Sequence, residues 1–206
     1  MKPSATFWNL IAKKYIAGDI ADQATYERKL AQTQSLLQPD WTMLEVGCGS
    51  GNTALAHAPF VAKVTGIDFA EKMIEHARAQ ARTRGIDTAT FEHKGLDDFQ
   101  TDQSYDAVLM LSVLHLQPQW KQALRRAYDL TSAGGVFVSS TACITDISPM
   151  IAKVAPLISA LPVLPSLVAF TQAELLHEMA SVGFEIEDHW QATPKDATFI
   201  VARKPA

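Results

Sequence analysis

The stretch LEVGCGSGN, from Leu44 to Asn52, joins an apolar strand to a helix through glycines at alternate positions. These glycines are Gly47, Gly49 and Gly51. Glycine loses backbone entropy on folding and packs no side chain, so such a cluster indicates a tight bend or a close approach to another group. An ordinary strand-to-helix turn and a ligand-binding loop both fit this stretch by itself. The residues that follow decide between them.

The composition predicts one globular domain that does not bind nucleic acid. A chain of 206 residues can bury a substantial core without disulfides or metals. Its contents of 48% hydrophobic and 19% charged residues are typical of globular proteins. The formal net charge of −4 provides no electrostatic footprint for a nucleic acid.

Cysteine usage and the first residues predict a cytoplasmic protein without a metal site. The two cysteines, Cys48 and Cys143, are too few for a disulfide framework and show no metal-ligand spacing. The opening MKPSATFWNLIAKKY lacks the uninterrupted apolar core and the cleavage site of a secretory signal.

One apolar segment, Ser148 to Phe170, is as long as a membrane-spanning helix and carries a single charged residue, Lys153. Four prolines interrupt it, so a straight helix would break repeatedly. Its flanks also read as parts of one sheet. We therefore expect no transmembrane segment, and predict either a broken helical lid over an apolar pocket or a cover over the sheet edge.

The alternation of strands and helices predicts an α/β fold. Such a rhythm is typical of a mostly parallel, Rossmann-like sheet with helices on both faces. A short connection around Pro194 makes the last two strands an antiparallel hairpin. Strands are expected at 42–47, 62–68, 87–94, 105–115, 136–142, 184–192 and 197–204, which gives seven, and helices at 7–16, 23–37, 52–59, 70–85, 119–130 and 171–183.

Local signals refine this assignment. Thr171 and Glu174 form a capping box at the start of the last helix, and SAGG, residues 132–135, reads as a turn before the fifth strand. A single domain 1–206 is expected. Its parts are a helical N-terminal cap at 1–39, a ligand-binding core at 40–141, the apolar lid at 147–170, and a C-terminal helix with hairpin at 171–206.

Two carboxylates suggest what the glycine loop binds. In an open α/β sheet the ligand lies beyond the carboxyl ends of the strands, where the loop is expected. Asp68 ends the second strand 21 positions after Gly47, and a carboxylate there can accept hydrogen bonds from a ribose diol. Glu45 precedes the loop. A carboxylate at this position would repel a pyrophosphate but would attract a positively charged amine. An adenosine ligand with an amine is therefore favoured over NAD.

The loop is followed, in order, by VTGIDFAEKMIEHAR, YDAVLMLSVLHL and LTSAGGVFVSS. Together these motifs resemble the class I S-adenosylmethionine-dependent methyltransferases, in the small-molecule branch that includes ubiquinone-biosynthesis C-methyltransferases. The resemblance covers residues 40–141. It implies S-adenosyl-L-methionine as cofactor and in-line methyl transfer to a small acceptor, and the apolar segment at 147–170 suggests that this acceptor is rather apolar. The acceptor atom and the oligomeric state, monomer or homodimer, stay open.

The resemblance also implies roles for individual residues. Glu45 and the backbone of Gly47, Cys48 and Gly49 would hold the methionine moiety, and Asp68 the ribose. Gly95 stands where the family usually has an aspartate for the adenine. The remaining residues implied are Phe69 and Met73 beside the adenine, Leu96 and Asp97 at its edge, Leu111 and Ser112 near the methionine amine, and Tyr15 closing over the cofactor.

Catalysis would rest mainly on alignment of the reacting atoms. His115, after the fourth strand, is the candidate general base where the acceptor arrives protonated; packing against Trp120 is its structural alternative. Tyr15 is the second catalytic candidate, and simple packing of its helix is the structural alternative. Two other functions remain open: a cofactor-binding regulatory protein that has lost catalysis, and an NAD-dependent oxidoreductase.

Overall fold

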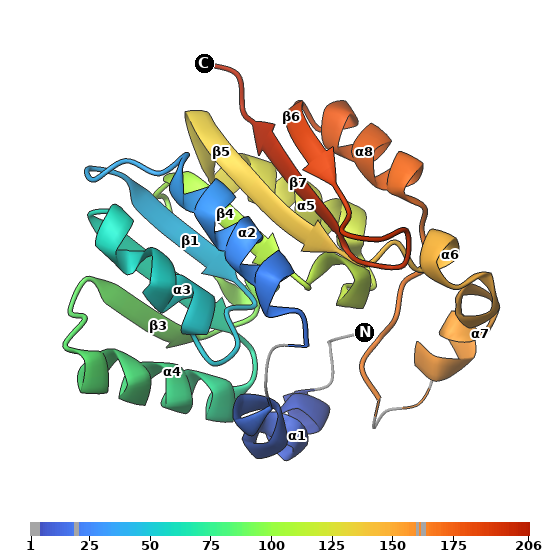
Figure 1. The fold of residues 1–206 in the computed structure, drawn as a ribbon, viewed down its shortest axis with the longest axis horizontal. Coiled ribbons are helices and arrows are strands. Elements are labelled where there is room, and N and C mark those ends of the chain that lie inside the picture. The colour runs from blue at the N-terminus through green and yellow to red at the C-terminus, as the bar shows by residue number, and fades with distance from the viewer. Residues whose placement is uncertain (1–4, 19–20, 160, 162–163) are drawn as a thin grey trace. The chain divides into compact units, whose positions relative to one another are not determined.

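The computed structural model describes residues 5–18, 21–159, 161 and 164–206. Within them, seven strands form a mixed sheet in the order β3-β2-β1-β4-β5-β7-β6 (Figure 1). The described chain divides into two compact parts, Ala5–Thr101 and Asp102–Ala206. The α/β class and the mostly parallel sheet expected from the sequence are confirmed.

The first part alternates helices with parallel strands. β1 pairs with β2, and β2 pairs with β3, both in parallel. Helices α3 and α4 contact β2, and α4 also contacts β3. The elements are α1 (Ala5–Ala17), α2 (Gln23–Gln34), β1 (Thr42–Val46), α3 (Asn52–His57), the 3-10 helix η1 (Ala58–Phe60), β2 (Lys63–Asp68), α4 (Glu71–Arg84), β3 (Ala89–His93) and the 3-10 helix η2 (Leu96–Asp98).

Helix α4 buries the face that its spacing predicts. Met73, Ile74, Ala77 and Ala81 recur every three or four residues and are all buried. The helix ends at Gly85, whose φ of 64° is left-handed and whose amide caps the last turn.

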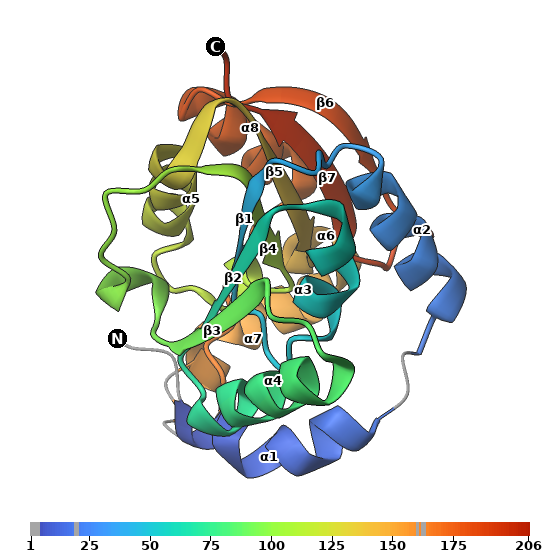
Figure 2. The same cartoon turned by 90° about the vertical axis from the view of Figure 1, so that its left-hand side faces the viewer.

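Helix α1 lies beside α4 in both ribbon views (Figures 1 and 2). Its buried Ala12 packs with Ala70 and Met73. The Oδ1 atom of Asn9 also accepts a hydrogen bond of 3.1 Å from the amide of Lys72, in the first turn of α4. Trp8 and Ile16 complete the cluster. The sequence analysis did not predict that α1 packs against the first turn of α4.

The second part contains the antiparallel end of the sheet. β4 and β5 are parallel, whereas β7 runs antiparallel to both β5 and β6, as the hairpin prediction requires. The elements are β4 (Tyr105–Leu111), the 3-10 helix η3 (Leu114–Leu116), α5 (Trp120–Leu130), β5 (Thr131–Thr141), α6 (Ile144–Ile147), α7 (Pro149–Ser159), α8 (Gln172–Ser181), β6 (Glu185–Trp190) and β7 (Thr198–Arg203).

The turn predicted at residues 132–135 is wrong, because these residues lie inside β5. The pairing of β5 with β4 is irregular between Tyr105 and Ala107, and Gly134 has a φ of 75°. A Cβ atom on Gly135 would stand 2.8 Å from the carbonyl oxygen of Asp106. The glycines therefore permit an irregular start to the strand rather than a free turn.

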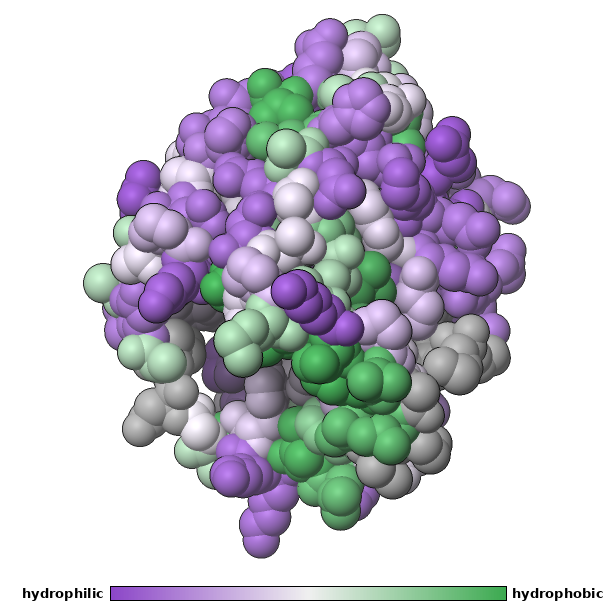
Figure 3. All heavy atoms as spheres, turned by 90° about the vertical axis from the view of Figure 1, so that its right-hand side faces the viewer, coloured by the Kyte–Doolittle hydropathy of each residue, from purple (hydrophilic) through white to green (hydrophobic). Residues whose placement is uncertain are grey.

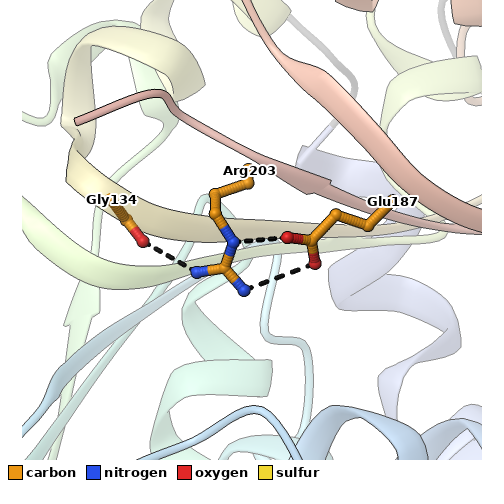
Figure 4. A network of polar contacts seen from close by, with 3 residues as sticks. All are labelled: Gly134, Glu187 and Arg203. Atoms are coloured by element: carbon orange, nitrogen blue, oxygen red, sulfur yellow. Dashed lines mark hydrogen bonds and ion pairs between the residues drawn. The ribbon is translucent and has the colours of Figure 1, made fainter.

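Arg203 fastens this irregular start to the C-terminal hairpin (Figure 4). Its Nη1 atom donates to the carbonyl oxygen of Gly134 over 2.8 Å. Its Nε and Nη2 atoms donate to the two carboxylate oxygens of Glu187 on β6. One guanidinium thus joins β5, β6 and β7 with the forked geometry that favours arginine over lysine.

The apolar segment begins at the last residue of α6 and contains α7, and residues 164–170 form neither helix nor strand. Helix α7 runs through Pro156 without a break, so the expected interruption at that proline is wrong, while residues 160, 162 and 163 lie outside the described residues. Met150 and Leu157 are 81% and 71% exposed, and apolar side chains gather on the molecular face shown in Figure 3. Among the described residues, no helix is both long and apolar enough to span a bilayer.

His57 gives the fold a pH-dependent weakness. It is fully buried in α3, and both ring nitrogens lack a hydrogen-bond partner among the described residues. Burial lowers its pKa to about 4, from an ordinary 6.5. Between these values the unfolded chain binds the proton and the folded chain does not. The contribution of the neutral ring to the free energy of unfolding is thus fully present above pH 6.5 and is lost as the pH falls.

We expect urea unfolding at pH 7 and pH 5 to show this loss. Wild-type protein should lose about 2 kcal/mol of unfolding free energy from His57 over this interval. His57→Leu should show a correspondingly smaller loss, whereas His177→Leu, at an exposed histidine of α8, should behave like wild type. Equal losses in wild type and His57→Leu would contradict the assignment.

Candidate functional site: a glycine loop and two buried carboxylates

The glycine loop continues from β1 by turning back onto β2. The amides of Gly47 and Cys48 both donate to the carbonyl oxygen of Ile67, over 2.8 Å and 3.0 Å. Gly47, Gly49 and Gly51 have φ angles of 68°, 52° and 79°, in the left-handed region that glycine adopts readily. The loop therefore needs glycine at all three positions.

The second and third glycines have different surroundings. A Cβ atom on Gly51 would stand 2.7 Å from the Cβ of Ala77 and 3.0 Å from the ring of Phe91. A Cβ atom on Gly49 would meet no described atom within 4 Å. Gly51 thus lets the loop pack closely on α4 and β3, whereas Gly49 borders open space.

Asp68 ties this loop to the next helix. Its Oδ2 atom accepts a 3.0 Å hydrogen bond from the amide of Gly49, and its Oδ1 atom accepts one of 2.8 Å from the amide of Ala70. The residue is 8% exposed. Desolvation raises the pKa of Asp68, and the hydrogen bonds from Ala70 and Gly49 and the charge of His93 oppose the rise.

Glu45 is the second carboxyl group at this end of the strands. It is 3% exposed, and its Oε2 atom has no hydrogen-bond partner among the described residues. Burial, and then the charge of Asp68, raise its pKa to about 8, against a backbone hydrogen bond from Ala54 in α3. A buried polar atom without a partner is costly, so its retention indicates a group that a ligand can satisfy.

Tyr15 brings α1 to the same two carboxyl groups. Desolvation of its hydroxyl, followed by the charges of Asp68 and then Glu45, raises the pKa of Tyr15. The tyrosine is nevertheless exposed overall, and its ring meets Trp8 edge-on with centroids 6.0 Å apart. The Tyr15 hydroxyl thus interacts electrostatically with both carboxyl groups, and its closure over a cofactor stays a prediction.

The residues predicted to surround an adenine differ in how far they are buried. Phe69 is half-buried next to Asp68, and its carbonyl oxygen lies 3.0 Å from Nε2 of His93. Met73, by contrast, is 2% exposed within the cluster that holds α1. Gly95 precedes η2, in which Leu96 is buried and Asp97 is exposed. A Cβ on Gly95 would have only ordinary contacts, the nearest at 3.8 Å from the Cβ of Phe69.

Leu111, Ser112 and His115 belong to the second part of the chain. Leu111 is the last residue of β4 and is half-buried, while Ser112 is exposed. Ser112 has a φ of 59°, the one positive φ of a non-glycine residue in the described chain, and its amide donates to the carbonyl oxygen of Ser140 over 2.7 Å. Such backbone strain is concentrated at functional sites, and nothing in the sequence signalled it.

His115 lies in η3, between the end of β5 and the apolar segment. Its Nδ1 atom accepts a 3.4 Å hydrogen bond from the amide of Ala142, and its carbonyl oxygen accepts one of 2.8 Å from the amide of Val168. Burial lowers the pKa of the imidazole to about 4. A neutral ring whose Nδ1 accepts a hydrogen bond carries its proton on Nε2.

The thiols and possible metal ligands add no further chemistry. Burial, and then the charges of Glu45 and Asp68, raise the pKa of Cys48, so the thiolate needed for nucleophilic attack is disfavoured. Within the described part of the chain, no three His, Cys, Asp or Glu side chains cluster as metal ligands do.

Two site groups were missed by the sequence analysis because they belong to the backbone. The amides of Ala54 and Ala70 are hydrogen-bonded to Glu45 and Asp68, respectively. Both lie at or near a helix N-terminus, where amides have no partner within the helix. A carboxylate just before a predicted helix start was the signal that could have revealed Ala70.

The two glycines should respond differently to alanine. Gly51→Ala places a Cβ atom 2.7 Å from Ala77 at a left-handed position, so it should cost about 3 kcal/mol or more of unfolding free energy. Gly49→Ala has the backbone strain without the collision and should cost about 1 kcal/mol. Denaturant unfolding measures both losses of free energy. Equal losses would show that the close packing around Gly51 does not add to the cost of its substitution.

Comparison with known proteins finds a protein family that matches the part of the chain containing this site. Residues 43–135 match the protein family described as "Methyltransferase domain". The ubiquinone biosynthesis O-methyltransferase of Serratia proteamaculans is 32% identical over 103 residues, which is 50% of this chain and 43% of that protein. The matched region thus spans less than half of the length of this curated relative.

Solved structures share the fold over nearly the whole chain. The N-methyltransferase NodS of Bradyrhizobium japonicum, in complex with S-adenosyl-L-homocysteine, is similar with a TM-score of 0.72 at 18% identity, covering 97% of this chain and 100% of that one. The [4+2]-cyclase SpnF is similar with a TM-score of 0.78 at 16% identity, covering 98% and 95%. At such identities the likeness shows the fold alone.

The family match runs from β1 to the irregular start of β5 and includes the glycine loop, Glu45 and Asp68. The fold around this region is shared by the solved N-methyltransferase NodS. Over residues 43–135 the chain is therefore similar to the methyltransferase domain family, and it shares the fold of a solved methyltransferase.

Proposed function

We propose that this protein transfers the methyl group of S-adenosylmethionine to a small acceptor molecule. The observation that carries the proposal is the buried Oε2 atom of Glu45, which has no partner among the described residues. It belongs to the same group of charges as Asp68, whose Oδ2 atom holds the amide of Gly49. A ligand with an amine at one end and a ribose at the other suits this pair of carboxyl groups.

The donor set fits the two ends of the cofactor. A carboxylate accepts charge-assisted hydrogen bonds from an ammonium group, which would satisfy Glu45. Each Asp68 oxygen accepts one backbone amide and keeps further acceptor capacity, so the ribose hydroxyls can bind without breaking these bonds. Gly49 borders open space and so offers bare backbone to the ligand.

The cofactor supplies an activated methyl group when it is bound, and the chain supplies its alignment. Glu45 and Asp68 would fix the amino-acid and ribose ends, and Tyr15 would exclude water from the α1 side. Alignment of this kind can contribute up to about 7–11 kcal/mol to a displacement reaction. The protein therefore needs no covalent intermediate.

An apolar acceptor is supported by the surface of α7. This helix exposes Met150, Val154 and Leu157 at spacings of four and three residues, which places them on one helix face. Ser159 holds the following chain in place, because its Oγ atom accepts from the amide of Leu167 over 2.9 Å and donates to that residue's carbonyl oxygen over 3.0 Å. We propose that segment 147–170 binds the apolar part of the acceptor.

For His115 the geometry favours hydrogen-bond donation over proton abstraction. The nitrogen without a proton, Nδ1, already accepts from Ala142, and the pKa of the ring lies near 4. A neutral Nε2–H group can orient an acceptor oxygen that arrives without its proton. We propose this positioning role instead of the general base that the sequence suggested.

A protein that binds the cofactor without transferring its methyl group is the second candidate. Gly95 stands in place of the aspartate that the family usually directs at adenine, and the [4+2]-cyclase SpnF has the same fold. A screen of acceptors in which S-adenosylhomocysteine is the measured product separates the two. Cofactor binding with no product from any acceptor would favour this second candidate.

Calorimetric titration with S-adenosylhomocysteine tests the cofactor assignment. Wild-type protein should bind it and should not bind NAD. Asp68→Asn should weaken binding about tenfold or more, since it removes a charged acceptor for the ribose. Asp87→Asn, at an exposed aspartate of the same part of the chain, is the matched control. Binding of NAD but not of the sulfur nucleoside would overturn the proposal.

The acceptor assignment is tested with phenols that share a headgroup and differ in alkyl chain length. Leu157→Ser should raise KM several-fold for the long-chain members, because it removes apolar contact area. It should leave the affinity for S-adenosylhomocysteine unchanged. Phe60→Ser changes an exposed apolar residue of η1 and serves as the control. An unchanged chain-length preference in Leu157→Ser would contradict a role for α7.

A further inference from the structure

We propose that Glu45 is a neutral carboxylic acid in the free protein and that it releases its proton to solvent when an amine-bearing ligand binds. This inference rests on the proposed function, because it takes the ligand to be the sulfonium nucleoside or its product. It goes further by making the recognition of the amino-acid end depend on pH. The adenosine end would bind without this dependence.

The position of Glu45 disfavours a charge while the site holds no ligand. Its side chain projects from β1, the register of which places Glu45 opposite Gly66 of β2. It is 3% exposed, and Oε2 has no partner among the described residues. An ionised carboxylate buried with an unsatisfied oxygen is costly, whereas the protonated form leaves a smaller polar group to desolvate.

Of the ionisable groups around Glu45, one opposes its ionisation and the others carry no positive charge that would favour it. Asp68, from the end of β2, repels a second negative charge. Tyr15 from α1 and Cys48 from the loop interact electrostatically with Glu45, and neither carries a positive charge. Only the backbone hydrogen bond from Ala54 favours the carboxylate, and within the described residues no cationic side chain lowers the pKa of Glu45, which lies at about 8.

An ammonium group reverses this balance. The free state holds Glu45–COOH and the ligand's –NH3⁺ group separately. The bound state pairs Glu45–COO⁻ with –NH3⁺, and the displaced proton goes to the buffer, so atoms and charge balance. The ammonium provides the opposite charge and the hydrogen-bond donors that Oε2 lacks. Glu45 thereby selects ligands that carry an amine.

The sign of the pH effect follows from linkage. At pH 7 the free protein holds the proton and the complex does not, so a rising pH favours the complex. Affinity for S-adenosylhomocysteine should increase by up to about tenfold per pH unit between pH 6 and pH 8. Above the pKa of the free carboxyl group, the increase should level off.

The experiment is calorimetry on the whole protein at pH 7 in phosphate, HEPES and Tris, whose ionisation enthalpies differ. S-adenosylhomocysteine should release about one proton per molecule bound. 5′-Methylthioadenosine keeps the adenosine and the sulfur but lacks the amino acid, and it should release none. Glu45→Gln should abolish the release and flatten the pH dependence of S-adenosylhomocysteine binding, and circular dichroism checks that this variant is folded.

The wild-type measurements alone keep the inference testable if Glu45→Gln does not fold. Binding of S-adenosylhomocysteine without proton release and with a flat pH profile would overturn it and leave the proposed function standing. Equal proton release by both ligands would also overturn it, because the proton would come from the adenosine end. Failure of S-adenosylhomocysteine to bind at all would remove the proposed function itself.

Discussion

The two hydrogen bonds that Asp68 accepts are the interaction on which the site depends. They hold the amide of Gly49 in the loop and the amide of Ala70 before α4 with a single carboxylate at the end of β2. Since α1 packs through Ala12 on Ala70 and Met73, the same carboxylate indirectly fixes the helix that carries Tyr15. One residue thus coordinates three segments that are separate in the sequence.

The cost of this arrangement is a second buried carboxyl group beside the first. The repulsion between Glu45 and Asp68, together with burial, is unfavourable for folding with both groups ionised. Proteins retain such strained electrostatics where function needs them, and the perturbed pKa of Glu45 marks this edge of the sheet as a candidate functional site. Stability and ligand selection are therefore opposed at the same residue.

Much of this could be predicted from the sequence because it depends on local chemistry. Spacing or residue type predicts the buried face of α4, the glycine at its end, the capping box at Thr171 and the position of Asp68 at the end of its strand. What could not be predicted depends on partners distant in the sequence. The SAGG stretch became part of β5 because Arg203 and the backbone of Lys204 hold it, and the tautomer of His115 is set by Ala142.

The position of β7 has a consequence for how the sheet forms. β7 lies between β5 and β6, although it follows both in the chain. During synthesis β6 therefore emerges before the strand with which it pairs, and one edge of β5 stays open until β7 arrives. An unpaired strand edge is a template for pairing with other chains. The nascent sheet thus keeps this open edge until Thr198–Arg203 is made, and the Arg203 guanidinium then joins the three strands.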